Sequence, residues 1–148
     1  MKFKIESICV SHEKGVQKKE IPKALLIEGR GIEGDAHAGN WHRQVSFLAG
    51  EDIDEMRKKG LDLKPGDFGE NIVTRGIDWT KVKPGDRIKL GEAELEVTQL
   101  GKECHTPCAI YKAVGYCIMP EKGIFTKVIK GGTINAEDSG YYSFRQGS

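Results

Sequence analysis

The chain has 148 residues, and its 23 basic and 22 acidic side chains leave a net charge of +1, which argues against nucleic acid as a partner held by bulk charge. No apolar run approaches the roughly 18–20 residues that cross a bilayer, and the N-terminus lacks the apolar core of a signal peptide. We therefore expect a single domain over residues 1–148, in the cytoplasm and without a membrane partner, where cysteines stay reduced.

Short apolar or alternating stretches, bounded by glycines and polar turns, predict a succession of β-strands. The clearest is 93–98, where Ala93, Leu95 and Val97 alternate with polar residues, and Gly91 before them indicates a hairpin. In chain order the predicted strands are 3–10, 22–29, 44–48, 70–74, 86–90, 93–98 and 124–129, after which Gly131 and Gly132 turn the chain into Thr133 and Ile134.

Few helices are expected between these strands. Residues 51–59 are acidic at the start and basic at the end, with Gly60 at the place of a C-terminal cap. Ile53 and Met56 form a narrow apolar stripe for packing on a sheet, and a second short helix is predicted over 107–114. Short strands and glycine turns with few helices predict a mainly β fold of the α+β type, a closed or nearly closed β-barrel.

The loop of residues 31–39 contains three glycines around Asp35 and His37. Its backbone can approach a ligand closely; the alternative is a turn in which Asp35 accepts hydrogen bonds from free N–H groups. Arg43 follows, where a guanidinium could bind phosphate or carboxylate or simply lie on the surface.

A second polar loop covers residues 65–71, just before an apolar strand. Asp67, Glu70 and Asn71 lie close to two glycines there. Such a loop can present N–H groups and side-chain acceptors to a polar ligand; the alternative is a turn whose carboxylates satisfy its own amides.

Three of the four cysteines gather in residues 104–117. A structural zinc or iron–sulfur site could use Cys104, His105, Cys108 and Cys117, but the intervening stretches of three and eight residues do not form two close pairs. A reactive or metal-ligating Cys104 is favoured, because thiolates are soft ligands and good nucleophiles.

Three other reactive side chains receive structural interpretations. Cys9 lies in the alternating strand 3–10 and is predicted to be a small buried side chain. His12 and His42 are predicted to lie on the surface, and His42 could line a site beside the loop 31–39.

Taken in order, the motifs resemble the MOSC family, which is named for the C-terminal domain of molybdenum cofactor sulfurase. The resemblance runs from about residue 3 to residue 138 and is closest to small stand-alone bacterial members that carry the extra Cys108 and Cys117. The matching segments are 31–39, 43–46, 66–71, 85–86, 95–99, 104–105, 123–125 and 130–134. Ala36 departs from the pattern, since many relatives have arginine there.

The resemblance implies a MOSC-like barrel with a pocket for molybdopterin-type cofactor. Cys104 would ligate molybdenum or carry a persulfide, and Arg43 with the loop amides would hold the pterin phosphate. The candidate residues are Cys104 and His37 for catalysis; Gly34, Asp35, His37, Arg43, Gln44, Asp67, Gly69, Glu70, Asn71, Cys104 and His105 for cofactor binding; and Cys104 for molybdenum.

The implied function is cofactor maturation or reduction of N-hydroxylated compounds. The chain lacks the pyridoxal phosphate-dependent sulfurase module of larger members, so we expect no pyridoxal phosphate in it. Sulfur would then come from a partner such as a cysteine desulfurase or a cofactor-biosynthesis protein. The alternative from the residues is a zinc or iron–sulfur interaction module that uses Cys104, His105, Cys108 and Cys117.

Overall fold

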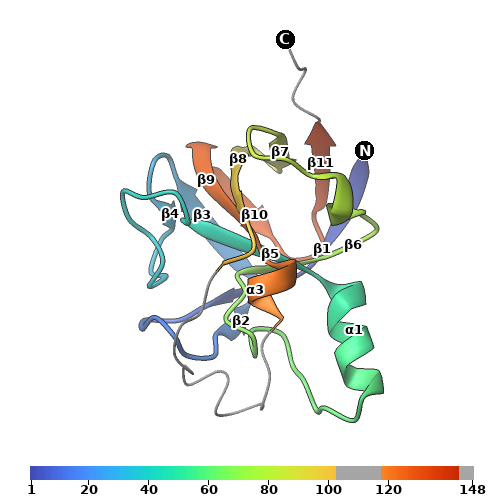
Figure 1. The fold of residues 1–148 in the computed structure, drawn as a ribbon. Coiled ribbons are helices and arrows are strands. Elements are labelled where there is room, and N and C mark those ends of the chain that lie inside the picture. The colour runs from blue at the N-terminus through green and yellow to red at the C-terminus, as the bar shows by residue number, and fades with distance from the viewer. Residues whose placement is uncertain (103–117, 144–148) are drawn as a thin grey trace.

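Seven strands close into a barrel in the computed structural model, which describes residues 1–102 and 118–143 (Figure 1). The strands follow one another around the ring in the order β1-β11-β7-β8-β9-β5-β6, and β6 pairs back with β1. Neighbours are antiparallel except β5 and β6. The bounds are β1 Lys2–Val10, β5 Val45–Ala49, β6 Ile72–Arg75, β7 Arg87–Leu90, β8 Ala93–Leu100, β9 Ile124–Lys130 and β11 Ser139–Ser143. The predicted mainly β barrel is confirmed.

A smaller sheet lies beside the barrel. It consists of β10 (Gly132–Asn135), β3 (Lys23–Ile27) and β4 (Gly31–Ile32), in that order and antiparallel. The short strand β2 (Lys19–Ile21) pairs with the far end of β1. The sequence interpretation missed β2, β4 and β11, because each has few side chains on a buried face.

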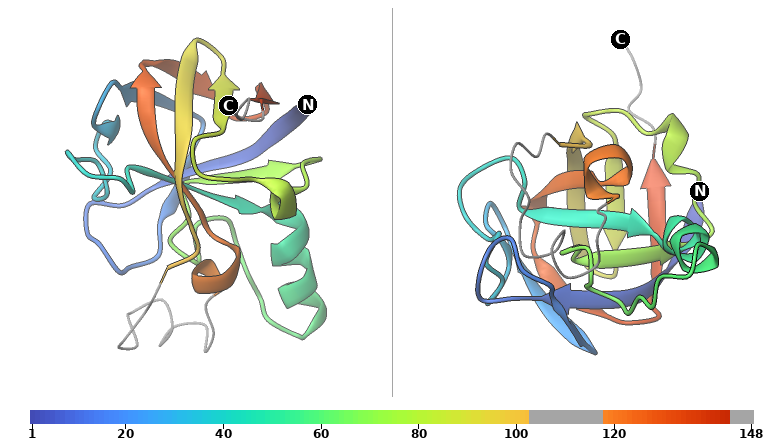
Figure 2. Two further views of the ribbon diagram at one scale, coloured as in Figure 1. Left: turned by 45° about the horizontal axis from the view of Figure 1, so that its top comes forward. Right: turned by 60° about the horizontal axis from the view of Figure 1, so that its bottom comes forward.

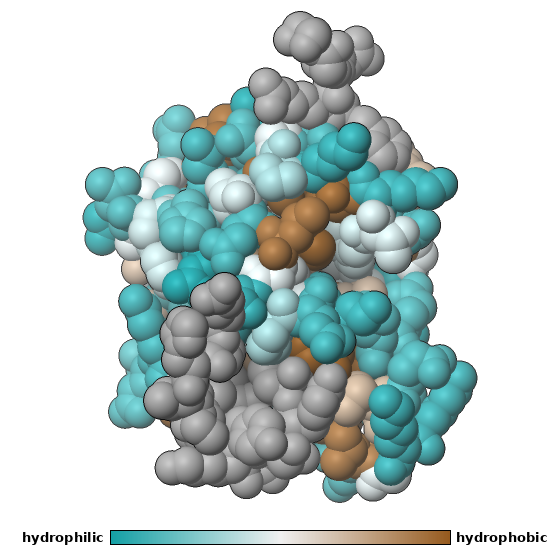
Figure 3. All heavy atoms as spheres, viewed as in Figure 1, coloured by the Kyte–Doolittle hydropathy of each residue, from teal (hydrophilic) through white to brown (hydrophobic). Residues whose placement is uncertain are grey.

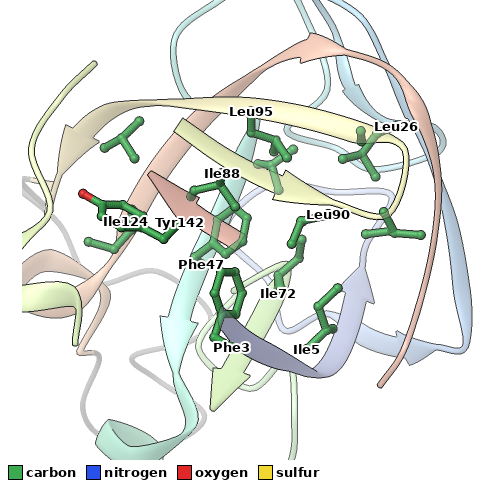
Figure 4. Close-up of a cluster of buried hydrophobic side chains, with 14 of the residues drawn as sticks. Phe3, Ile5, Leu26, Phe47, Ile72, Ile88, Leu90, Leu95, Ile124 and Tyr142 are labelled. Atoms are coloured by element: carbon green, nitrogen blue, oxygen red, sulfur yellow. The ribbon is translucent and has the colours of Figure 1, made fainter. Parts of the chain in front are cut away.

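The barrel interior is filled by side chains from every strand of the ring, with Leu26 from β3 (Figure 4). Trp79 belongs to the same core, with its ring centroid 5.7 Å from that of Phe47, 6.0 Å from Phe3 and 6.1 Å from Tyr142. The predicted alternation of β8 is confirmed, since Ala93, Leu95 and Val97 are all buried. Among the described residues the barrel interior is packed with side chains, so we expect ligand-binding groups at its rim.

The helix α1 (Gly50–Lys58) packs on the outer face of the barrel wall (Figure 2). Its Ile53 and Met56 are buried against Leu48 and Val73, as the apolar stripe predicted. β5 is buried at every position, because one face lines the barrel and the other is covered. Gly60 has φ +94° just past the helix, confirming the predicted cap.

Two further short helical segments, η1 (Trp79–Lys81) and α3 (Met119–Lys122), were not predicted. The predicted helix over 107–114 lies outside the described residues. Within the described ranges no helix has the length and apolar character needed to span a bilayer.

Candidate functional site

The loop of residues 31–39 folds back on itself after β4. The Asp35 N–H donates to the Ile32 carbonyl at 3.1 Å, and the Gly39 N–H donates to the Arg30 carbonyl at 2.7 Å. The buried Asp35 carboxylate accepts hydrogen bonds from the backbone N–H groups of Ser11 and His37, each at 3.1 Å. Asp35 therefore has the N–H-accepting role that the turn interpretation predicted.

A lysine that the motif analysis passed over completes this loop. The ammonium of Lys18 lies 2.7 Å from Oδ1 of Asp35, 3.0 Å from Nδ1 of His37 and 3.1 Å from Oγ of Ser11. The side chains of Lys18 and Asp35 are both 0% exposed. In the sequence Lys18 precedes Lys19 within a polar stretch, and nothing in that pattern distinguishes the buried lysine from its exposed neighbour.

Burial opposes the charge on both members of this pair. It lowers the pKa of the Lys18 ammonium from its usual value, against the attraction of Asp35. Burial would also raise the pKa of the Asp35 carboxyl, but the adjacent Lys18 ammonium and the hydrogen bonds that the carboxylate accepts outweigh it and hold that pKa below its usual range. An ionised aspartate surrounded by donors keeps Lys18 as its counter-ion.

Lys18 also connects the two glycine loops. Its N–H donates to the Gly66 carbonyl at 2.8 Å. Gly66 has φ +90°, and a Cβ there would come within 2.1 Å of the Lys18 carbonyl oxygen. The two loops that the sequence singled out therefore meet at Lys18, with Asp35 and His37 at its ammonium and Gly66 at its backbone.

The polar side chains of the second loop are engaged within the protein. The Glu70 carboxylate accepts the N–H groups of Gly66 at 2.8 Å and Phe68 at 3.0 Å, so this turn does satisfy its own amides. Asn71 accepts the Ser46 N–H at 3.0 Å and donates to the Cys9 carbonyl at 3.0 Å.

Two other members of the same loop also make local hydrogen bonds. Asp67 accepts the Lys64 N–H at 2.8 Å, and the Gly69 N–H donates to Gly66 at 2.9 Å. Contact of Asp67, Gly69, Glu70 or Asn71 with a cofactor stays a prediction.

Glu70 gives the fold a pH dependence. Burial raises the pKa of its carboxyl to about 7, against the N–H groups that favour the ionised form. A raised pKa favours the folded state at low pH, and that contribution is lost as pH rises through about 7. Between about pH 5 and pH 8, we expect ionisation of Glu70 to lower the unfolding free energy by about 3 kcal/mol. Urea unfolding at several pH values in this range measures the change in unfolding free energy. Glu70→Gln, which cannot ionise, should show a flatter dependence of unfolding free energy on pH. Parallel pH dependences in the two proteins would contradict the raised pKa of Glu70.

Basic side chains surround Trp41 at the rim of the barrel. The Lys14 ammonium lies 4.5 Å and the Arg43 guanidinium 4.7 Å from the Trp41 ring centroid, and the His37 ring stacks on the indole at 6.2 Å. The Trp41 Nε1–H donates to the His37 carbonyl at 2.7 Å. We call Lys14, His37 and Arg43 the basic cluster.

Arg43 has an unsatisfied donor. Its Nε is buried and has no hydrogen-bond partner among the described residues. The guanidinium lies 4.7 Å from Trp41 and 5.7 Å from Phe125, measured to the ring centroids. Gln44, the next residue, is buried. Its side-chain amide donates to the Gly39 carbonyl at 3.0 Å and accepts the Val128 N–H at 2.9 Å. A buried donor of this kind calls for an acceptor such as an anionic oxygen.

A hollow elsewhere on the protein has the opposite charge character. It has a volume of about 300 Å³ and is lined by residues next to η1 and α3, among them the acids Asp52, Asp78 and Glu121 with Lys122. Hydrophobic residues gather near the centre of the face seen in Figure 3. With more acids than bases, this hollow repels an anion, so the basic cluster is the better anion site.

The predicted thiol chemistry lies mostly outside the described residues. This holds for Cys104, His105, Cys108 and Cys117. Cys9 is fully buried, and burial raises the pKa of its thiol, which confirms its structural interpretation. Among the residues that are described, no group of three or more His, Cys, Asp or Glu could hold a metal ion.

The chain that leads to the cysteine segment passes beside the basic cluster. Oε1 of Gln99, at the end of β8, lies 2.8 Å from Nε2 of the exposed His42. His42 is the neighbour of Trp41 and packs edge-on against it, with ring centroids 5.9 Å apart. Lys102, the last described residue before the segment, donates its N–H to the Pro120 carbonyl at 3.1 Å. Cys104 follows Lys102 by two residues in the sequence.

Comparison with known proteins agrees with this architecture. Solved structures of similar fold include the YuaD protein from Bacillus subtilis, with a TM-score of 0.80 and 23% identity, covering 98% of each chain. YiiM from Escherichia coli has a TM-score of 0.72 at 20% identity over 100% of this chain and 72% of its own. YiiM from Geobacillus stearothermophilus has a TM-score of 0.74 at 19% identity, over 97% of this chain and 76% of its own.

These identities establish a shared fold and no more. No curated protein gives a significant match. The sequence pattern of the MOSC domain, in contrast, matches residues 34–140, which include the loop with Asp35 and His37 and every barrel strand from β5 to β9. The chain therefore belongs to the MOSC domain family.

Proposed function

We propose that this chain binds a molybdopterin-type cofactor, or handles its sulfur, with an anionic group of the ligand held by the basic cluster. One observation carries the proposal: the buried Nε of Arg43 has no acceptor among the described residues. The Lys14 ammonium contacts the same indole, so a second positive charge lies near that donor, and the His37 ring stacks on this indole as well. An unsatisfied guanidinium donor near a second cation fits a phosphate better than any neutral group.

The chain's own residues would divide the work. Arg43 and Lys14 would bind the phosphate, and Trp41 would keep their charged ends in place through its ring face. His37 would donate a hydrogen bond at the edge of the ligand. Bound molybdenum would supply two-electron redox chemistry, with the Cys104 thiolate as a soft ligand.

A sulfur-carrier role uses the same thiol differently. The Cys104 thiolate would attack the outer sulfur of a persulfide on a cysteine desulfurase, forming a new S–S bond and releasing the donor's thiolate. No oxidant is needed, because the outer sulfur arrives already oxidised. A persulfide on Cys104, seen by mass spectrometry after incubation with such a donor, supports this version.

Loading in cells that make the cofactor tests the proposal. We expect molybdenum and pterin to copurify with the wild type and to be lost from Cys104→Ser. Arg43→Gln removes a charged hydrogen bond worth about 1.5–3 kcal/mol, so bound pterin should fall about tenfold or more. Metal analysis and pterin fluorescence of the purified protein measure both.

The matched control is Arg30→Gln, an exposed arginine of the neighbouring turn, which should load like the wild type. Absence of molybdenum, pterin and persulfide from the wild type would contradict the proposal. Stoichiometric zinc or iron, with Cys108→Ser as damaging as Cys104→Ser, would favour the metal-binding interaction module instead.

A further inference from the structure

The ammonium of Lys18 is surrounded by three acceptors. A lysine ammonium has three donors and no acceptor. Around Nζ lie Oδ1 of Asp35 at 2.7 Å, Nδ1 of His37 at 3.0 Å and Oγ of Ser11 at 3.1 Å. The Ser11 hydroxyl donates to the Glu13 carbonyl at 2.8 Å, so a lone pair is left for Lys18. Each of the three ammonium protons therefore has one acceptor.

We propose that Lys18 is a positioning residue that fixes His37 in the tautomer with its proton on Nε2. Nδ1 has to accept from an ammonium that has nothing but donors, so the proton of the neutral ring belongs to the other nitrogen. The residue is also held in place, since its ring stacks on Trp41 and its backbone N–H donates to Oδ2 of Asp35.

The consequence is an available donor. Nε2 of His37 has no hydrogen-bond partner within the described part of the chain, and the side chain is 25% exposed. The ring therefore presents an N–H group, and the guanidinium of Arg43 contacts the same Trp41 indole. That arrangement suits an anionic oxygen and would disfavour a ligand that itself offers a donor at this point.

Asp35 could favour the other tautomer of His37. An aspartate commonly orients a histidine by accepting from Nδ1–H, which would leave Nε2 as the acceptor. Here Oδ2 of Asp35 lies 3.8 Å from Nδ1, beyond hydrogen-bond range, whereas Lys18 lies at 3.0 Å. A proton on Nδ1 would also point at the ammonium. The distances therefore assign Nδ1 to Lys18.

The inference rests on the proposed function only for the nature of the acceptor, an anionic oxygen of the ligand. The tautomer belongs to the ligand-free protein. An experiment can therefore contradict the tautomer assignment without contradicting cofactor binding, and the reverse also holds.

Long-range ¹H–¹⁵N correlation of the histidine rings tests the tautomer at about pH 8, above the ordinary histidine pKa of about 6.5. His37→Gln assigns the signals. We expect the wild type to show a protonated Nε2 and an unprotonated Nδ1 whose resonance is moved by its hydrogen bond. In Lys18→Met the proton should transfer to Nδ1, which then faces the Asp35 carboxylate.

Lys19→Met, at the exposed neighbour, should leave the His37 signals unchanged. The double variant Lys18→Met/Asp35→Asn removes both charges and should give a mixture of tautomers, which provides a second test if the single variant does not fold. Nδ1–H in the wild type, or an unaltered His37 spectrum in either Lys18 variant, would overturn the role of Lys18.

Inorganic phosphate probes the acceptor. Adding it to the wild type should shift the Nε2–H resonance, and Arg43→Gln should need a higher phosphate concentration for the same shift. A resonance that phosphate leaves unmoved would overturn the donor role toward an anion, while the tautomer result stands by itself.

Discussion

The Lys18→Met variant is expected to lose about 3–5 kcal/mol of unfolding free energy, because the Asp35 carboxylate would stay buried without its cation. Both side chains are 0% exposed, and their charged atoms lie 2.7 Å apart. Methionine nearly matches the length of lysine, so the loss reports the missing charge rather than a cavity. Urea unfolding followed by tryptophan fluorescence measures it.

Two comparisons isolate this effect. Lys19→Met changes the exposed neighbour and should stay within about 0.5 kcal/mol of the wild type. Lys18→Met/Asp35→Asn removes both charges and should recover part of the loss, since an uncompensated buried charge costs more than an absent pair. A loss below about 1 kcal/mol in Lys18→Met would mean that Asp35 finds water or another cation.

The second large effect is expected for Gly66→Ala, with a loss of about 4 kcal/mol or more. The new methyl would lie 2.1 Å from the Lys18 carbonyl oxygen and 2.7 Å from its carbon. These are backbone atoms, which cannot rotate away as a side chain can. Relief requires Lys18 to move, so the His37 ring signals should change together with stability.

Gly60→Ala is a matched control for the backbone conformation. Gly60 has φ +94°, close to the +90° of Gly66, but a Cβ there meets nothing within 4 Å. It should lose about 1–2 kcal/mol from conformational strain alone. Similar losses in the two variants would show that the close approach to Lys18 is not what requires glycine at 66.

Local pattern was enough to predict most of the barrel wall. The alternation in 93–98 indicated both the strand and its buried face, and Ile53 and Met56 indicated which side of α1 packs on the wall. β11 could not be found in this way. Its Gly140 has to be glycine because a Cβ would lie 2.3 Å from the Phe3 ring, a constraint set by the neighbouring strand. The strand that closes the ring therefore gave no apolar signal of its own.

The candidate site, like the barrel, could be predicted from the sequence only in part. Asp35, His37 and Arg43 stood out because glycine-rich loops with polar residues are unusual for simple turns. The spatial arrangement of these three side chains could not be predicted from the sequence. Trp41 brings His37, Lys14 and Arg43 to a common ring, and neither Trp41 nor Lys14 was a candidate from the sequence.

The amino-acid order alone determined the β-rich class, the strands with clear alternation, the family resemblance and the loops worth attention. These are short-range properties, set by side-chain period and backbone freedom over a few residues. Only the tertiary structure decided that Lys18, and not Lys19, is buried between the two loops. Burial of a charge depends on partners that folding brings from distant segments, and for Lys18 these are Asp35, His37 and Gly66.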